Sequence, residues 1–210
     1  MERLILIFEI IGTISFALTG AMTGLKKQMD IFGVCVLGVT TAVGGGIIRD
    51  LILGLTPPSA FCDPTSVLIA IAVSIIVFFP AVRRIFYRNK WLYEHVLLLA
   101  DSAGLGIFTV CGARVAMEAG DGANRFLVIF VAALTGVGGG VLRDLFAGDR
   151  PYIFVKHVYA CSALLGALVC VYLWPLVGRD IAMLVGFVLV FAMRLCSAHF
   201  RWSLPHARRL

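Results

Sequence analysis

Hydrophobic residues occur along this chain in seven long runs, separated by short stretches of charged residues and proline. Each run is near the roughly 20 residues that a helix needs to cross about 30 Å of hydrocarbon. The runs are continuous rather than alternating, so they indicate helices and not the strands of a membrane β-barrel. The sequence therefore predicts seven transmembrane helices, over residues 4–25, 31–55, 65–82, 93–113, 126–147, 153–174 and 181–198.

The first three predicted helices and the next three share a spacing of residue types. An acid, a Gly, a Phe and a Gly-Ala pair recur 92 residues later, as Glu9, Gly12, Phe16, Gly20-Ala21 and Asp101, Gly104, Phe108, Gly112-Ala113. Three spans are an odd number, so the second copy enters the membrane from the opposite side. We predict an all-α integral membrane protein with one membrane domain: two inverted three-helix repeats, residues 4–82 and 93–174, and a seventh helix, residues 181–198.

A Gly-Gly-Gly-x-x-Arg-Asp motif lies inside the second predicted helix and again inside the fifth, 94 residues later. Its two copies are Gly44, Gly45, Gly46, Arg49, Asp50 and Gly138, Gly139, Gly140, Arg143, Asp144. A glycine costs a helix interior about 1 kcal/mol relative to alanine. A charged residue at the bilayer centre costs roughly 2.5 to 3.5 kcal/mol on insertion scales. The motif therefore has a purpose besides spanning the membrane.

The glycine triplets predict an ion pathway at the membrane midplane. Inverted repeats with interrupted helices mark transport sites. A helix broken at a triplet leaves carbonyl groups without partners at the negative end of a half-helix, which favours a cation. Without Cβ atoms, an ion can approach the backbone closely. We expect a transient monovalent cation at the triplets and no other metal; the alternative interpretation is close packing of helices through small residues.

The ionisable residues inside the predicted helices are further site candidates, because such residues usually face a cavity or pair with one another. Arg49 and Arg143 can pair with the aspartates that follow them, or across the repeats. These charges either flank the pore or only lock the repeats together. The matched acids Glu9 and Asp101 either line the cation pathway or bind a partner side chain. Lys156 and His157 are interpreted as interfacial residues.

Composition supports a membrane protein and excludes several other classes. The chain is 60% hydrophobic and 14% charged, whereas a soluble domain has about 25% charged residues. The net charge is +6, and most of the basic residues lie in short loops between the apolar runs. They therefore indicate which side of the membrane each loop faces, rather than nucleic-acid binding. No nucleophile–base pair, metal-ligand spacing or nucleotide loop is visible, and the triplets lack the Lys-Ser/Thr ending of a phosphate loop. We therefore predict no enzyme activity, no cofactor and no nucleic-acid partner.

Basic residues divide unevenly between the two sides that seven spans define. One side has Arg3, Arg114, Arg125 and Arg179; the other has Lys26, Lys27, Arg83, Arg84, Arg88, Lys90, Arg150, Lys156, Arg201, Arg208 and Arg209. The side with more basic residues is expected to face the cytoplasm. The N-terminus is therefore predicted outside and the C-terminus in the cytoplasm.

The doubled motif, in a seven-span chain of this length, resembles the prokaryotic branch of the trimeric intracellular cation (TRIC) channel family. The resemblance covers about residues 4–198. It implies a homotrimer in the cell inner membrane, whose subunits each have a pore for monovalent cations, chiefly potassium or else sodium. It also implies that the second and fifth helices line this pore, here at Gly44–Gly46 and Gly138–Gly140. Membrane lipid is the remaining expected partner.

Two other functions fit the same repeat. A secondary transporter of a small solute, such as a neutral amino acid, also uses a broken inverted repeat for alternating access. Such a transporter would saturate with solute and could couple to a proton through Glu9 or Asp101. A non-transporting membrane scaffold would lose only stability when its triplets are replaced.

Overall fold

The computed structural model describes residues 2–120, 124–155, 158–200 and 202, and all regular elements within these ranges are helices. The long helices are α1 (Glu2–Lys26), α2 (Ile31–Ile52), α4 (Thr65–Phe78), α6 (Lys90–Glu118), α7 (Arg125–Phe146), α9 (Tyr159–Val177) and α10 (Arg179–His199). The connections between them hold three short helices, α3 (Ser59–Cys62), α5 (Pro80–Arg88) and α8 (Tyr152–Val155).

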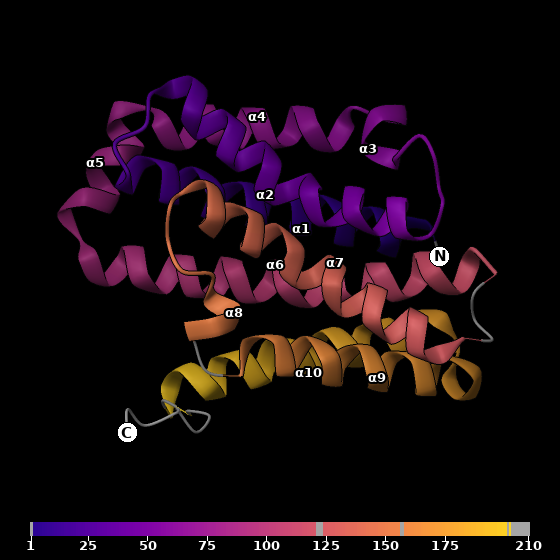
Figure 1. Ribbon diagram of the computed structural model, residues 1–210. Helices are drawn as coiled ribbons and strands as arrows, with labels where there is room; N and C mark the ends of the chain where they lie inside the picture. The colour runs from indigo at the N-terminus through magenta and orange to yellow at the C-terminus, as the bar shows by residue number, and fades with distance from the viewer. Residues whose placement is uncertain (1, 121–123, 156–157, 201, 203–210) are drawn as a thin grey trace, which may run out of the picture.

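The long helices run side by side as one bundle, and α1 begins at the end opposite to that where α10 finishes (Figure 1). Six of them are long and apolar enough to cross a membrane. The helices α4 and α5 pass the same test only together, as a pair bent by 73°. With this pair counted as one span, the described residues give seven, as the sequence predicted.

Two predicted spans, the third and the sixth, differ from the observed helices in where the chain breaks. The third, residues 65–82, is divided because α4 ends at Phe78 and α5 begins at Pro80. Proline has no N–H to continue a helix and pushes the preceding residue, here Phe79, into an extended conformation. With 14 residues, α4 is only about 21 Å long. The sixth span begins at Tyr159 rather than Ile153, because residues 152–155 form the separate helix α8.

The ends of α2 and α7 show the repeat in the backbone. Leu55 N–H donates to Asp50 O at 2.8 Å, and Asp149 N–H donates to Asp144 O at the same distance. Between them, Gly54 and Gly148 have φ of +70° and +69°. This is the Schellman ending, which needs a left-handed residue and so favours glycine. Both copies of the motif therefore end their helices in the same way.

The repeats pack together through matched aromatic residues. The rings of Phe16 in α1 and Phe108 in α6 lie 5.1 Å apart. A Cβ on Gly12 would lie 3.2 Å from the Phe108 ring, and one on Gly104 would overlap the Phe16 ring. Each phenylalanine thus fills the space left by a glycine of the other helix. The helix α10 lies outside the repeat and packs against α6 and α9.

Candidate functional site

The glycine triplets lie within continuous helices. The helix α2 is unbroken from Ile31 to Ile52, and α7 is unbroken from Arg125 to Phe146. The predicted helix break is therefore wrong for this structure. The carbonyl groups of the triplets are not released by an interrupted backbone, so the glycines need another physical explanation.

The triplets are the point where α2 and α7 cross. A Cβ on Gly45 would overlap the carbonyl oxygen of Thr135, and a Cβ on Gly139 would overlap that of Thr41. These are equivalent contacts in the two repeats. Backbone atoms cannot rotate away, so glycine is required at both positions. The crossing therefore agrees with the alternative interpretation from the sequence, which was close packing of two helices through small residues.

Each Arg-Asp pair binds the connection that follows its helix. Arg49 Nε donates to Asp50 Oδ1 at 2.7 Å, and Arg143 Nε donates to Asp144 Oδ1 at 2.9 Å. The second carboxylate oxygen accepts a backbone N–H at 2.8 Å, from Ser59 for Asp50 and from Tyr152 for Asp144. Pairing is therefore within each motif. Among the described residues, neither arginine pairs with the aspartate of the other repeat.

Arg143 is also the centre of a buried polar cluster. Its side chain is 1% exposed, and Nη1 donates to Asp101 Oδ1 at 2.7 Å and to Thr19 Oγ1 at 3.1 Å. Arg194 of α10 approaches the other oxygen of Asp101 at 3.8 Å, and its guanidinium lies 4.7 Å from the ring centroid of Tyr159. We call Asp101, Arg143, Asp144, Tyr159 and Arg194 the Asp101 cluster. Its two arginines balance its two acids, as buried charges require.

Several polar atoms of the Asp101 cluster have no hydrogen-bond partner among the described residues. They are Asp101 Oδ2, Arg143 Nη2, Tyr159 OH and Arg194 Nε. The Tyr159 hydroxyl and Arg143 Nη2 both face Gly140, whose Cβ would lie 2.8 Å and 3.7 Å from them. Buried polar atoms of this kind usually bond ordered water. The cluster is thus a polar site beside the second triplet that water can enter.

Within the part of the chain that the structure describes, the first repeat has no equivalent of this cluster. Glu9, which corresponds to Asp101, lies 3.4 Å from Arg114 and has a side chain that is 45% exposed. The side chain of Asp101 is 2% exposed. Asp101 contacts Arg143 at 2.7 Å and Arg194 of α10 at 3.8 Å, and α10 lies outside the repeat. The two matched acids therefore differ in burial, because Asp101 lies inside a charged cluster and Glu9 lies partly exposed.

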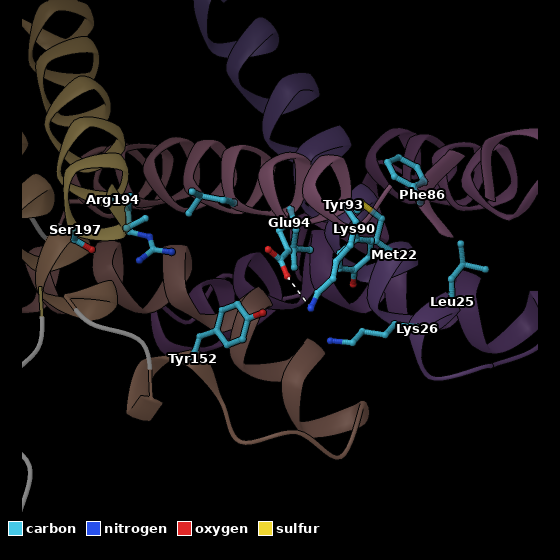
Figure 2. A pocket seen from close by; sticks show the side chains of 13 residues that line it. Met22, Leu25, Lys26, Phe86, Lys90, Tyr93, Glu94, Tyr152, Arg194 and Ser197 are labelled. Carbon is cyan, nitrogen blue, oxygen red and sulfur yellow. Dashed lines mark ion pairs between the residues drawn. The ribbon is translucent and has the colours of Figure 1, made fainter. Parts of the chain in front are cut away.

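A cavity of about 780 Å³ leads towards the Asp101 cluster. Figure 2 shows its charged lining, with Glu94 and Lys90 near the middle and Arg194 towards one end. Lys26 adds a further positive charge, and Met22, Leu25 and Phe86 give it an apolar wall. A smaller cavity of about 80 Å³ shares Glu94, Leu97, Leu98, Tyr152 and Arg194 with it and is also lined by Asp101. The triplets do not line either cavity, so the Asp101 cluster separates them from it.

Arg194, Tyr159 and Thr19 were not predicted as site residues from the sequence. Arg194 had a signal, because it is the one charged residue within the predicted seventh span, 181–198. Tyr159 and Thr19 had no such signal in the sequence, because they lie near Arg143 only in the folded protein. Lys156 and His157 lie outside the described residues. No group of three or more His, Cys, Asp or Glu side chains within the described ranges could hold a metal ion.

Comparison with known sequences finds relatives over nearly the whole chain. The family model described as glycine transporter matches residues 6–81 and 98–175. The UPF0126 membrane protein YvgT of Bacillus subtilis is 36% identical over 202 residues, which are 95% of this chain and 95% of that protein. The UPF0126 inner membrane protein YadS of Escherichia coli K12 is 35% identical over 199 residues, 94% of this chain and 93% of that protein.

Solved structures share the same fold. One described as "Structural basis for conductance through TRIC cation channels" has a TM-score of 0.86 and 38% identity, and the match covers 97% of both chains. A prokaryotic TRIC channel in 0.5 M KCl has a TM-score of 0.87 and 32% identity over 97% of this chain and 100% of that one. A TRIC orthologue from Rhodobacter sphaeroides has a TM-score of 0.85 and 35% identity, over 94% and 98%.

Proposed function

We propose that this chain, which belongs to the prokaryotic branch of the trimeric intracellular cation (TRIC) channel family, conducts monovalent cations, chiefly potassium. The observation that carries the proposal is the match in both sequence and fold to solved TRIC channels along nearly the full chain. One pore per subunit and a homotrimeric assembly are part of the proposal. The inner membrane is its proposed location, as in the relative YadS.

We propose that ions pass where α2 and α7 cross, with Gly44–Gly46 and Gly138–Gly140 lining the path. The carbonyl oxygens of Thr41 and Thr135 each point at a glycine of the facing helix. A small separation of the two helices turns these oxygens towards the gap, where they can replace part of the hydration shell of a cation. The absence of side chains at Gly45 and Gly139 keeps that gap clear. The repeats themselves are proposed to span 4–82 and 93–174, so each supplies one helix to the crossing.

The acids Glu9 and Asp101 are proposed to attract cations at the two approaches to the crossing. Negative side chains inside a membrane protein mark ion pathways. Glu9 is part-exposed, whereas Asp101 is bound by Arg143 and Arg194. A cation that leaves the cavity therefore meets two arginines before it reaches the triplets. We take the described arrangement as the closed pathway, and opening requires these arginines to move.

The second candidate is a transporter of glycine or a similar small amino acid. The description of the family model favours it. The large cavity described above lies on one side of the crossing, which also suits alternating access, since this mechanism exposes one side at a time. A channel shows a flux that rises with ion concentration without early saturation. A transporter shows saturable uptake that competes with unlabelled solute.

Flux measurements on one proteoliposome preparation test the two candidates. The first assay measures release of trapped potassium against a sodium exterior, and the second measures uptake of labelled glycine. We expect potassium release that is fast relative to protein-free liposomes and no saturable glycine uptake. Saturable glycine uptake without potassium release would overturn the channel and favour the transporter. Gly139→Ala serves as the inactive control, because its Cβ would meet backbone at the proposed path.

A further inference from the structure

The helix α6 has two acids on the side that lines the cavities. Glu94 and Asp101 are seven residues apart, so they lie on one face of the helix and about 10 Å apart along its axis. Both line the small cavity of about 80 Å³, and Glu94 also lines the large one. The side chain of Glu94 is 60% exposed, whereas that of Asp101 is 2% exposed. The helix therefore leads from an accessible acid in the large cavity to a buried acid in the Asp101 cluster.

The first repeat has a pair of acids at the same spacing. The offset of 92 residues that relates Glu9 to Asp101 also relates Glu2 to Glu94. Glu2 is the first residue of α1, and Glu94 lies in the second turn of α6. Figure 1 shows that these two helices begin at opposite ends of the bundle. The repeated unit thus begins with an acid near each end of the molecule, two turns before the deeper acid.

The charge balance along the cavities depends on Glu94. Among the described residues, the large cavity is lined by the basic residues Lys26, Lys90 and Arg194 and by one acid, Glu94. The small cavity is lined by Arg194 and by two acids, Glu94 and Asp101. The balance therefore changes from positive to negative where the two cavities meet, and Glu94 is the acid that they share. Without its charge, the large cavity would have only basic groups and the small one would be neutral.

The carboxylate of Glu94 is accessible to a passing ion. Its ion pair among the described residues is with Lys90, one turn earlier, at 3.8 Å, and Figure 2 shows this pair within the lining of the large cavity. Both side chains are exposed, and an exposed pair of this kind is weak. A hydrated cation can therefore compete with Lys90 for Glu94. Deeper in, Asp101 Oδ2 also lacks a hydrogen-bond partner within the described ranges.

We propose that Glu94 concentrates cations where the two cavities meet and sets the preference for cations over anions at this entrance. The inference rests on the proposed channel, whose path it extends from the Asp101 cluster into the large cavity. Acidic side chains at a constriction gather cations, because the apolar walls around them focus the field of the charge. Removing one charge that lies about 4 Å from an ion changes the local ion concentration about fivefold in water. Glu94 is then the attracting charge of this entrance, and Arg194 is its barrier.

Single-channel recording at two salt concentrations tests the role of Glu94. The Debye length is about 30 Å at roughly 0.01 M and about 3 Å at roughly 1 M, so only the dilute solution lets the charge act on the ions around it. We expect Glu94→Gln to lower the potassium conductance about fivefold in dilute KCl and to leave it unchanged in concentrated KCl. The loss should be larger for current that enters through the cavity, so the variant rectifies. Its reversal potential in a KCl gradient should show a lower preference for potassium over chloride.

Three further variants separate the charge of Glu94 from its structural contacts. Glu94→Asp keeps the charge and should conduct as the wild type does. Lys90→Gln removes a positive charge from the same cavity and should raise the conductance in dilute KCl, which keeps the test open if Glu94→Gln does not fold. Asp63→Asn removes one negative charge from an exposed position that lines neither cavity, and it should conduct as the wild type does.

An unchanged conductance of Glu94→Gln in dilute KCl would overturn the role of Glu94. So would an equal loss in concentrated KCl, a loss of the same size in Asp63→Asn, or a lower conductance in Lys90→Gln. In each of these cases the wild type still conducts, so the channel itself would stand. A wild type that passes no current, in bilayers where a known channel does, would contradict the proposed channel and the role of Glu94 with it.

Discussion

Arg143 Nη1 lies 2.7 Å from Asp101 Oδ1, and this contact stands between the large cavity and the second glycine triplet. It joins α7 to α6 within the apolar bundle, where both side chains are nearly inaccessible to solvent. The corresponding residues of the first repeat, Arg49 and Glu9, have other partners. The proposed closed pathway rests on this difference between two otherwise matched halves.

Asp144→Asn should destabilise the protein strongly. Asp144 is 3% exposed and accepts hydrogen bonds from Arg143 Nε and the backbone N–H of Tyr152. Breaking a buried ion pair costs about 3–5 kcal/mol, because it leaves a charge without compensation. Thermal unfolding of the purified protein in detergent measures the loss. Glu9→Gln is the matched control, since its part-exposed pair contributes about 1 kcal/mol or less. Equal unfolding temperatures for Asp144→Asn and wild type would show that Asp144 does not stabilise the folded protein.

Alanine at Gly45 or Gly139 should destabilise the protein at the crossing of α2 and α7. The added Cβ would meet a backbone carbonyl in both cases, and overpacking of this kind costs about 1–3 kcal/mol. Gly46→Ala is the control from the same triplet. Its nearest neighbour, Arg49 Nη2, would lie 3.7 Å away, which is ordinary contact. Unfolding temperatures should fall for the first two variants and stay unchanged or rise for Gly46→Ala. A uniform response of all three would contradict the crossing geometry.

Gly140 and Tyr159 should show a coupling that a double-mutant cycle can measure. A Cβ on Gly140 would lie 2.8 Å from the Tyr159 hydroxyl and 3.7 Å from the ring carbon that bears it. Gly140→Ala should therefore be destabilising in wild type and much less so with Tyr159→Phe, which removes the oxygen. We expect an interaction free energy of about 0.5–3 kcal/mol in unfolding experiments. Additive effects would mean that the hydroxyl does not face Gly140.

Arg194→Gln should increase cation flux. The charge of Arg194 lies at the junction of the two cavities, and it pairs with Asp101 at 3.8 Å. A unit charge about 4 Å away opposes a cation by roughly 4 kcal/mol at the dielectric of a protein surface. Lowering this repulsion by only about 1.4 kcal/mol is enough for a roughly tenfold rise in potassium flux. Arg179→Gln, on the same helix but paired with Asp180 and Glu118, should leave the flux unchanged. A decrease with Arg194→Gln would contradict the barrier.

Much of the fold could be predicted from the sequence, because membrane helices follow from apolar length alone. The inverted repeat followed from the matched spacing of Glu9 and Asp101 and of the two motifs. The break at Phe79 was missed because the apolar run continues through Pro80, and hydropathy gives no weight to a missing N–H. Likewise, residues 152–155 are apolar enough to extend a span, although they form a separate short helix.

The site was harder to predict, because glycine has no Cβ and is therefore compatible both with a break in a helix and with the close crossing of two helices. Only the neighbour decides, and for Gly45 that neighbour is Thr135, 90 residues away in the sequence. The same limit applies to Arg143. Its adjacent partner Asp144 was one of the two predicted arrangements, but its contact with Thr19 depends on the packing of α1 against α7.

The most direct test of the proposed function is single-channel recording from purified protein in a planar bilayer with a potassium chloride gradient. A potassium-conducting channel should give discrete current steps that reverse near the potassium equilibrium potential, and Gly139→Ala should abolish them. Steps that reverse near the chloride potential would contradict the cation channel. So would a bilayer without steps from protein that takes up glycine saturably in liposomes.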